Sequence, residues 1–336
     1  MSTTPVRPRR KARLDSTVIV YVALVVVVIV GAILVNTAGR NFLSDGNIRD
    51  ILTGMSVLGL VAVGQTLVVL TGSLDLSVPY VISLSSLLAA ETMRGDPNNI
   101  AQGVVVALAF AAIVGLANGL VVSKLKVNGF IATLGVGLII KGYLDTNYNG
   151  SAGSVPAAFQ VIGATGIGPV PISTIIMLAL ATGVFVFLKK TRMGHHIFAV
   201  GGSLEVSRLS GLRVARPIIF AHVLCSVMAG LAGLLLASRL GVGSPTVGSQ
   251  GGYDLLSIAA VVLGGTLLAG GRGSVWGTIG GVAIFAVLDS VMSAIQFNPF
   301  LKDVVRGLII VAAVAIYTGR GIESRRARFA AKDVTS

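Results

Sequence analysis

Apolar residues dominate the chain in long runs, and short polar, basic or glycine-rich intervals separate them. A helix needs about 20 apolar residues to cross the hydrocarbon core of a bilayer, and most of the runs are of this length. The pattern predicts an all-α, polytopic integral membrane protein with about ten transmembrane helices. The predicted spans are residues 17–38, 51–71, 76–93, 101–123, 127–144, 171–188, 216–238, 254–271, 274–296 and 300–318. Three of them (76–93, 127–144 and 300–318) are short or contain a charge, so eight or nine spans are also compatible with the pattern.

The longest polar interval between predicted spans covers residues 189–216 and is strongly basic. Its apolar positions, among them Ile197, Phe198 and Val200, favour a short amphipathic helix held against the membrane. Glycines around this helix are typical of turns that let the chain fold back. The interval therefore offers a surface that a cytosolic partner can contact.

The distribution of positive charge predicts the topology. With the N-terminus in the cytoplasm, 19 of the 26 lysine and arginine residues fall on the inner side of the ten predicted spans. Inner loops of membrane proteins carry such an excess, so both termini are expected in the cytoplasm. The chain then divides into a basic tail at 1–16, a transmembrane permease domain at 17–318 and a second basic tail at 319–336. Because topology explains the net charge of +13, nucleic acid is not expected as a partner.

Composition excludes several classes of protein. With 54% hydrophobic and 12% charged residues, and a mean hydropathy of +0.90, the chain cannot bury its apolar side chains in one water-soluble core. Cys225 is the only cysteine, which excludes an intrachain disulfide and makes a redox centre an unfavoured interpretation. The 43 glycines favour close helix packing in lipid.

One predicted helix boundary carries a carboxylate. Gly72 and Pro79 interrupt the helical pattern between two spans, and Asp75 lies between them. A carboxylate at membrane depth must face protein or water, so this segment is either a broken helix lining a path or a cytoplasmic turn with a solvated or capping Asp75. Asn118, inside the fourth span, either hydrogen-bonds a substrate or bridges two helices, and Phe130 either lines a pore or anchors at the interface.

The remaining candidates favour structural roles. His222 lies in an apolar run and is expected to be a packed or hydrogen-bonded helix residue, and no metal site is expected. The glycine-rich residues 260–274 lack the Lys-Ser/Thr end of a phosphate-binding loop and are interpreted as a tight helical hairpin with Arg272 at the inner surface. Asp289 either forms an ion pair or lines a pore. The outer connection at 145–170 either meets a protein or is a flexible loop.

Four segments, taken in order, resemble the permeases of bacterial ABC importers for ribose, xylose, galactose and related simple sugars. They are GSLDLS at 72–77, FIATLG at 130–135, GHHIFAVGGSLEVSRLSGLRV at 194–214 and VVLGGTLLAGGRGSVWGTIGG at 261–281. The likeness runs from about residue 50 to 317. Val78-Pro79 departs from the usual Val-Gly, and Asn128-Gly129 stands where prolines are common. The Ile-x-Leu-Pro of the general importer loop is missing, as is normal for the sugar branch.

The resemblance implies a function and its partners. The chain would be the permease subunit of an importer in the bacterial inner membrane, translocating a monosaccharide that a soluble or lipid-anchored binding protein delivers. It would pair with a second permease copy and with a cytoplasmic ABC ATPase, and it would not be an enzyme itself. ATP and Mg would bind the ATPase, and this chain would hold no cofactor. A coupling loop at 189–216 would dock on that ATPase.

The resemblance also implies roles for individual residues. Those expected at the ATPase contact are Gly194, Glu205, Arg208, Gly211 and Arg213. Those expected along the substrate path are Asp75, Ser77, Asn118, Phe130 and Thr133.

Two other classes of protein compete with this interpretation. An ion-driven secondary transporter would use intramembrane carboxylates, for which Asp75, Glu91 and Asp289 are available. Such transporters often show two matching halves with paired broken helices, whereas the sequence indicates one clear break and no convincing repeat. A membrane enzyme would need a nucleophile with a base, or a set of metal ligands, and the sequence offers neither pattern.

Overall fold

The computed structural model describes residues 16–298, 301–309 and 311. These residues are mostly helical, and one short hairpin joins β1 (Gly166–Ile167) to β2 (Val170–Pro171). The helices are α1 (Ser16–Thr37), α2 (Asp45–Leu70), α3 (Val78–Met93), the 3₁₀ turn η1 (Pro97–Asn99), α4 (Ile100–Ser123), α5 (Gly129–Asn147), α6 (Ala157–Ala164), α7 (Ile172–Lys190), α8 (Arg192–Gly202), α9 (Leu204–Leu209), α10 (Ala215–Leu240), α11 (Val247–Gln250), α12 (Tyr253–Leu263) and α13 (Val275–Ala294). Residues 301–309 are helical as well.

The predicted fold class, an all-α polytopic membrane protein, is confirmed. Among the described residues, seven helices are long and apolar enough to cross a membrane. They are α1, α2, the helix formed by η1 with α4, α5, α7, α10 and α13. Two shorter apolar helices, α3 and α12, lie beside them. The two basic tails, and most of the predicted span at 300–318, lie outside the described residues.

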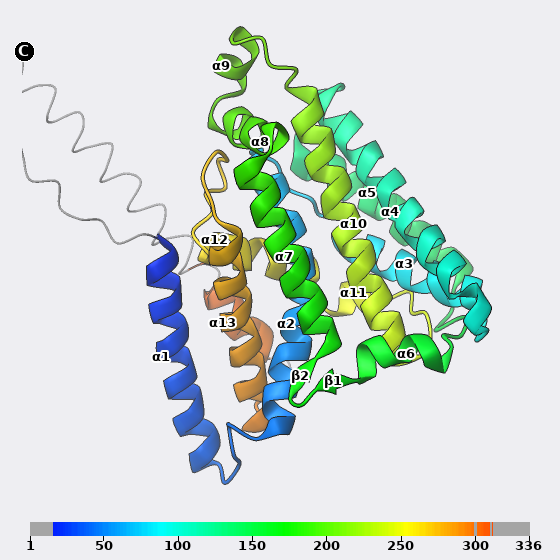
Figure 1. Cartoon of the computed structure of the whole chain (residues 1–336), viewed down its shortest axis with the longest axis vertical. Coiled ribbons are helices and arrows are strands. Elements are labelled where there is room, and N and C mark those ends of the chain that lie inside the picture. The colour runs from blue at the N-terminus through cyan, green and yellow to red at the C-terminus, as the bar shows by residue number, and fades with distance from the viewer. Residues whose placement is uncertain (1–15, 299–300, 310, 312–336) are drawn as a thin grey trace, which may run out of the picture.

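Helix α2 is the centre of the bundle. Its second half, from Ser56 to Leu70, is buried throughout, and the helix packs against α7, α10, α12 and α13. Helix α10 in turn packs against α3 and α4. Helix α1 lies at the edge of the molecule against α13, with most of its apolar side chains exposed as a lipid-facing helix requires (Figure 1). The bundle thus surrounds the second half of α2.

The two ends of the bundle differ. Helices α8 and α9 and the loop between α12 and α13 lie at one end, whereas α6 and the β hairpin lie at the other (Figure 1). The N-terminal end of α1 points toward the end that carries α8 and α9. The connection at 145–170 was predicted either to meet a protein or to be a flexible loop. It contains one short helix, α6, and the β hairpin.

Two sequence predictions need correction near the second glycine-rich segment. The span predicted at 254–271 ends early, because α12 stops at Leu263. The helical hairpin predicted at 260–274 is instead an irregular loop at 264–273 between two helices. The physical reason is backbone conformation: Gly265, Gly270 and Gly271 have φ values of +88°, +85° and +72°, which a right-handed helix cannot contain.

Glycines hold α4 and α10 close together. A Cβ added at Gly119 would lie 2.6 Å from the Cα of Ile219, and one at Gly115 would lie 2.6 Å from the Cα of Val223. In lipid, helices associate largely through van der Waals packing, so small residues at such positions determine how closely two backbones approach. This contact fixes the position of α10 beside the centre of the bundle.

We expect Gly119→Ala to destabilise the protein. The overlap with α10 costs about 1–3 kcal/mol, which exceeds the gain of about 1 kcal/mol from replacing glycine inside a helix. Gly142→Ala, in α5, is the matched control, since nothing lies within 4 Å of its added Cβ. Heating each variant with a thiol-reactive fluorophore reports unfolding, because the single cysteine, Cys225, is buried. Equal midpoints for the two variants would contradict the packing argument.

Candidate functional site

The chain leaves helical geometry between α2 and α3, as the predicted break at Gly72 to Pro79 requires. Gly72 has a φ of +81°, and the residues up to Ser77 are not helical. A break inside a membrane leaves backbone groups that need other partners. The Leu76 N–H donates to Thr133 Oγ1 at 2.9 Å, and the Ser77 N–H donates to Asp75 Oδ1 at 3.0 Å. Side chains thus replace the missing helical hydrogen bonds.

Asp75 is the centre of a buried polar cluster. Its Oδ1 accepts a hydrogen bond from Ser77 Oγ at 2.6 Å. Asn118 Nδ2, on α4, donates to Ser77 Oγ at 2.8 Å and lies 3.5 Å from both carboxyl oxygens. From α10, His222 Nδ1 lies 3.4 Å from Asp75 Oδ2, and His222 Nε2 lies 3.2 Å from Ser73 Oγ. The cluster therefore joins the break to α4 and α10.

Thr133 joins the break to a third helix. Its hydroxyl lies 2.8 Å from the carbonyl of Gly129 and 3.2 Å from that of Leu74, and it also accepts the Leu76 N–H. Gly129 has no side chain at the point where α5 meets the break, and an added Cβ there would overlap Ser73 Oγ. The start of α5 is thus fixed directly against the break.

The structure brings four of the five predicted path residues together. Asp75, Ser77, Asn118 and Thr133 are all buried, in the contacts described above. Phe130, one turn before Thr133 on α5, is instead 48% exposed and lies apart from them. Of the two alternatives for Asn118, the hydrogen bonds favour a bridge between α4 and the break. Asp75 is not a solvated residue, because its side chain has no exposed surface.

The expectation for His222, a hydrogen-bonded helix residue, is confirmed. Its contacts with Asp75 and Ser73 are the part of the cluster that sequence reasoning missed. An isolated histidine in an apolar run suggests burial with a partner, but nothing in the sequence identifies a partner some 147 residues away. Among the described residues, no group of three or more histidine, cysteine, aspartate or glutamate side chains is placed to hold a metal ion.

Two helices, not one, form the basic interval between α7 and α10. Gly194 is buried at the turn from α7 into α8, where an added Cβ would lie 2.6 Å from the Cα of Leu188. Thr191 caps α8 by accepting the Gly194 N–H at 3.1 Å. The glycine therefore allows α8 to start immediately against the end of α7.

The other predicted coupling residues lie on α9 and just beyond it. Glu205 and Arg208 are exposed on α9, and Arg213 is exposed beyond it. Gly211 ends the helix with a φ of +79°, and the Leu212 N–H donates to the carbonyl of Ser207 at 3.0 Å. This is the glycine-capped helix end that a left-handed residue permits. The structure thus gives Gly194 and Gly211 definite backbone roles.

Helix α8 ends where the two irregular segments of the bundle meet. The Gly271 N–H, in the loop before α13, donates to the carbonyl of Leu70 at the end of α2, at 3.0 Å. Gly201 of α8 lies against both residues: its added Cβ would overlap the Leu70 oxygen and lie 2.6 Å from the Gly271 nitrogen. We call Leu70, Gly201 and Gly271 the glycine junction. The sequence indicated turns here but not this contact.

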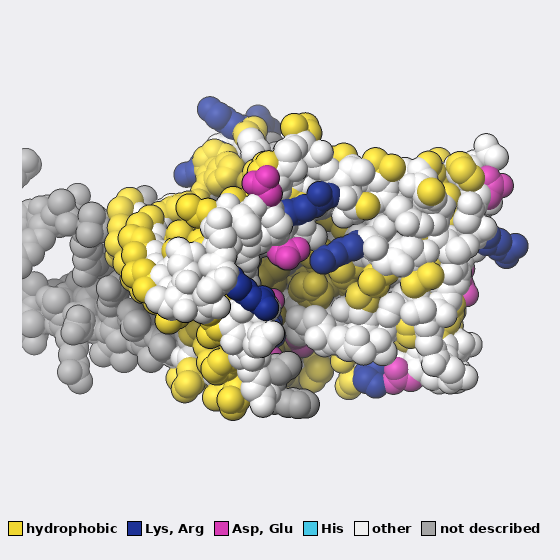
Figure 2. Space-filling model, turned by 90° about the horizontal axis from the view of Figure 1, so that it is seen from below, with side chains coloured by type: hydrophobic (Ala, Val, Ile, Leu, Met, Phe, Trp, Pro, Cys, Tyr) yellow, Lys and Arg dark blue, Asp and Glu magenta, His cyan; other side chains and the backbone are white. Residues whose placement is uncertain are grey.

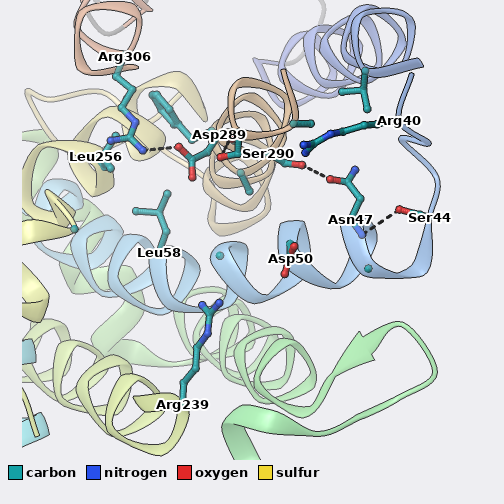
Figure 3. Close-up of a pocket in the computed structure, with 18 of the residues that line it drawn as sticks. Arg40, Ser44, Asn47, Asp50, Leu58, Arg239, Leu256, Asp289, Ser290 and Arg306 are labelled. Carbon is teal, nitrogen blue, oxygen red and sulfur yellow. Dashed lines mark hydrogen bonds and ion pairs between the residues drawn. The ribbon is translucent and has the colours of Figure 1, made fainter. Parts of the chain in front are cut away.

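At the opposite end, the molecule is hollowed between α1, α2, α10, α12 and α13. The cavity has a volume of about 900 Å³. Charged side chains surround a hollow on this face (Figure 2), and Figure 3 shows those that line it. Asp289 Oδ1 accepts from Arg306 at 2.6 Å, and Ser290 Oγ donates to Asn47 Oδ1 at 2.6 Å. Of the two alternatives for Asp289, the ion pair is confirmed, and the residue also lines this cavity.

A tyrosine near the same end is held in its neutral form. Tyr148, just past α5, donates a hydrogen bond to Glu91 Oε2 at 2.7 Å. Burial raises the pKa of Tyr148 well above its usual value, and this hydrogen bond raises it further. The hydroxyl therefore keeps its proton at physiological pH and can donate to Glu91 throughout, which holds the end of α5 against α3.

Comparison with known proteins identifies the family. A model described as "Branched-chain amino acid transport system / permease component" matches residues 47–314. The ribose import permease of Escherichia coli (strain K12) is 37% identical over 290 residues, covering 84% of this chain and 89% of the relative. The ribose import permease of Bacillus subtilis (strain 168) is 34% identical over 288 residues (84% and 88%). The galactose/methyl galactoside import permease of Haemophilus influenzae (strain ATCC 51907 / DSM 11121 / KW20 / Rd) is 33% identical over 294 residues (82% and 87%).

The chain belongs to the ribose/galactose-type permease family of ABC importers. The resemblance that the four sequence segments indicated is thereby confirmed. No solved structure matched the chain.

We expect Asp75→Asn to destabilise the protein, because the amide replaces an acceptor oxygen with a donor inside a cluster built around that acceptor. Leaving buried partners unsatisfied costs about 1–3 kcal/mol. Asp145→Asn is the control: it breaks an exposed pair with Lys141, which contributes little to stability. Thermal unfolding followed by Cys225 labelling compares the two variants. A midpoint for Asp75→Asn within experimental error of the control would show that the cluster is not stabilising.

Proposed function

We propose that this chain is the permease subunit of an ATP-driven importer for a simple sugar, acting as a multi-pass protein of the bacterial inner membrane. The relatives named as ribose and galactose import permeases, at 32–37% identity over more than four fifths of the chain, support this substrate class. The cytoplasmic partner is an ABC ATPase that binds ATP and Mg, and an external sugar-binding protein delivers the solute. The permease itself catalyses no reaction.

The observation that carries the coupling mechanism is the glycine junction. Helices α8 and α9 lie at one end of the bundle, with Glu205 and Arg208 exposed, and the far end of α8 contacts both irregular segments. A partner that moves α8 therefore acts on α2 and α13 through backbone contacts that cannot be compressed. We assign residues 189–216 as the coupling loop, with α8 and α9 as its helices.

The charge at this end fits the same assignment. A shallow hollow there is lined by residues 212–216 together with Lys124 and Arg208, and it includes Arg213 and Arg216. Positive charge of this kind is typical of the cytoplasmic side. With α8 and α9 in the cytoplasm, the proposed topology places both termini in the cytoplasm, and the segments that contain α3, α12 and residues 301–309 would bring the seven long helices to ten crossings.

The proposed topology also bears on how two permease copies assemble. A second permease copy would complete the path, and the apolar faces of α4 and α5 left exposed by one copy would contact that copy or lipid. The buried cluster around Asp75 lies on the break that the moving parts share, so Asp75, Ser77, Asn118 and Thr133 would change partners when the path opens. Phe130 would face the path or the lipid from the exposed start of α5.

The test compares two adjacent glycines. We expect Gly201→Ala to reduce the ATP hydrolysis that the loaded binding protein stimulates by about tenfold or more, because the added methyl disrupts the glycine junction. Gly202→Ala is the control, since nothing lies within 4 Å of its Cβ. Each variant is reconstituted with the ATPase in proteoliposomes, and ATP hydrolysis and ribose or galactose uptake are measured.

Two results would refute the proposal. If no ATPase co-purifies, and the chain alone moves solute along an ion gradient, the chain is a secondary transporter. If Gly201→Ala and Gly202→Ala show the same stimulated hydrolysis, the glycine junction does not transmit the motion, although the chain remains a permease.

A further inference from the structure

The cavity at the end of the bundle opposite α8 and α9 is lined by helices and loops of a single chain. Its walls come from the C-terminal end of α1, the first half of α2, the ends of α10 and α13, and α11 with the start of α12. Under the proposed topology this end faces outward. The cavity is thus placed to receive a solute before any movement of the glycine junction.

Part of the charged lining is already satisfied. Asp289 pairs with Arg306 at 2.6 Å, and Lys302 lies 4.0 Å from the same carboxyl oxygen. Asn47 accepts from Ser290 and donates to the carbonyl of Phe42 at 2.7 Å. These bonds tie α2 and residues 302–306 to α13, so this side of the cavity is held in shape without a ligand.

Three other charged groups in the lining are not satisfied. Within the described part of the chain, no hydrogen bond or ion pair is made by the side chains of Arg40, Asp50 and Arg239. Figure 3 shows Arg239 reaching from α10 toward the middle of α2, and Asp50 standing on α2 itself. A guanidinium offers only donors and a carboxylate only acceptors. The cavity therefore presents two strong donor groups, Arg40 and Arg239, and one strong acceptor group, Asp50, all available to a ligand.

These groups match a polyhydroxylated solute. Each sugar hydroxyl both donates and accepts, so one molecule can accept from Arg239 and donate to Asp50, in charge-assisted hydrogen bonds. Leu58, Leu256 and Phe285 supply an apolar surface for the C–H faces of the ring. The volume of about 900 Å³ lies within the range of about 300–1,000 Å³ typical of small-molecule sites.

We propose that this cavity is a weak monosaccharide-binding site within one permease chain, in which Arg239 and Asp50 bind the sugar hydroxyls. This inference rests on the proposed function, because the sugar and the outward orientation come from it. The site is distinct from the buried cluster around Asp75. A dissociation constant on the order of millimolar is expected, because the cavity is open to water and few groups contact the ligand.

The test measures binding directly. The purified full chain, in lipid nanodiscs so that no sugar-headed detergent competes, is titrated with D-ribose, D-galactose and L-leucine and followed by saturation-transfer difference NMR. We expect signals from a sugar, and about tenfold weaker binding in Arg239→Gln and in Asp50→Asn. Arg94→Gln and Asp145→Asn are the matched controls, because both residues are exposed and neither lines the cavity. The controls should bind as the wild type does.

Several results would overturn the inference. They are no signal from either sugar, equal weakening in variants and controls, and binding of leucine in place of the sugars, since an amino acid can also pair with Arg239 and Asp50. Sugar uptake by the reconstituted wild-type complex separates the two proposals. Uptake without binding to this cavity refutes the site alone, whereas the absence of sugar uptake refutes the proposed function.

Discussion

The structure depends on one constraint: a polypeptide that leaves helical geometry inside a membrane must find new partners for its backbone groups. The segment between α2 and α3 finds side-chain acceptors for two of its backbone N–H groups. Thr133 satisfies the Leu76 N–H, and Asp75 satisfies the Ser77 N–H. The buried side chain of Asp75 is in turn stabilised by Ser77, Asn118 and His222, which surround it. The break thus fixes the positions of α4, α5 and α10, which supply those side chains.

The same constraint explains why glycines gather where irregular segments meet. At the glycine junction, the carbonyl of Leu70 has no helical partner, and the Gly271 N–H reaches it because neither Gly271 nor Gly201 carries a side chain. A backbone contact of this kind is stiffer than a contact between side chains, which can change rotamer. It therefore suits a point through which one part of the bundle must displace another, since close-packed contacts transmit displacement.

The sequence predicted those features that have a local signal. Gly72 and Pro79 mark the break, Asp75 marks a buried polar group, and the polarity of His222 inside an apolar run predicts a hydrogen-bonded role. The end of α12 was missed because residues 264–271 are as apolar as a membrane helix, and hydropathy does not detect the positive φ values that end it. The cavity was missed for another reason. Asp50 and Arg239, which have no partner among the described residues, belong to no motif and line one cavity only through tertiary packing.

Helix α2 connects the two ends of the molecule. Its first turns, around Asp50 and Leu58, line the cavity, and its last carbonyl, at Leu70, is held in the glycine junction. From Ser56 to Leu70 the helix is buried and packs against α7, α10, α12 and α13, which leaves it little room to bend. Under the proposed coupling, a shift of α8 would move α2 as a rod, and α2 would carry one wall of the cavity past α13 and α10. The proposed coupling at one end and the proposed solute binding at the other would then be properties of the same helix.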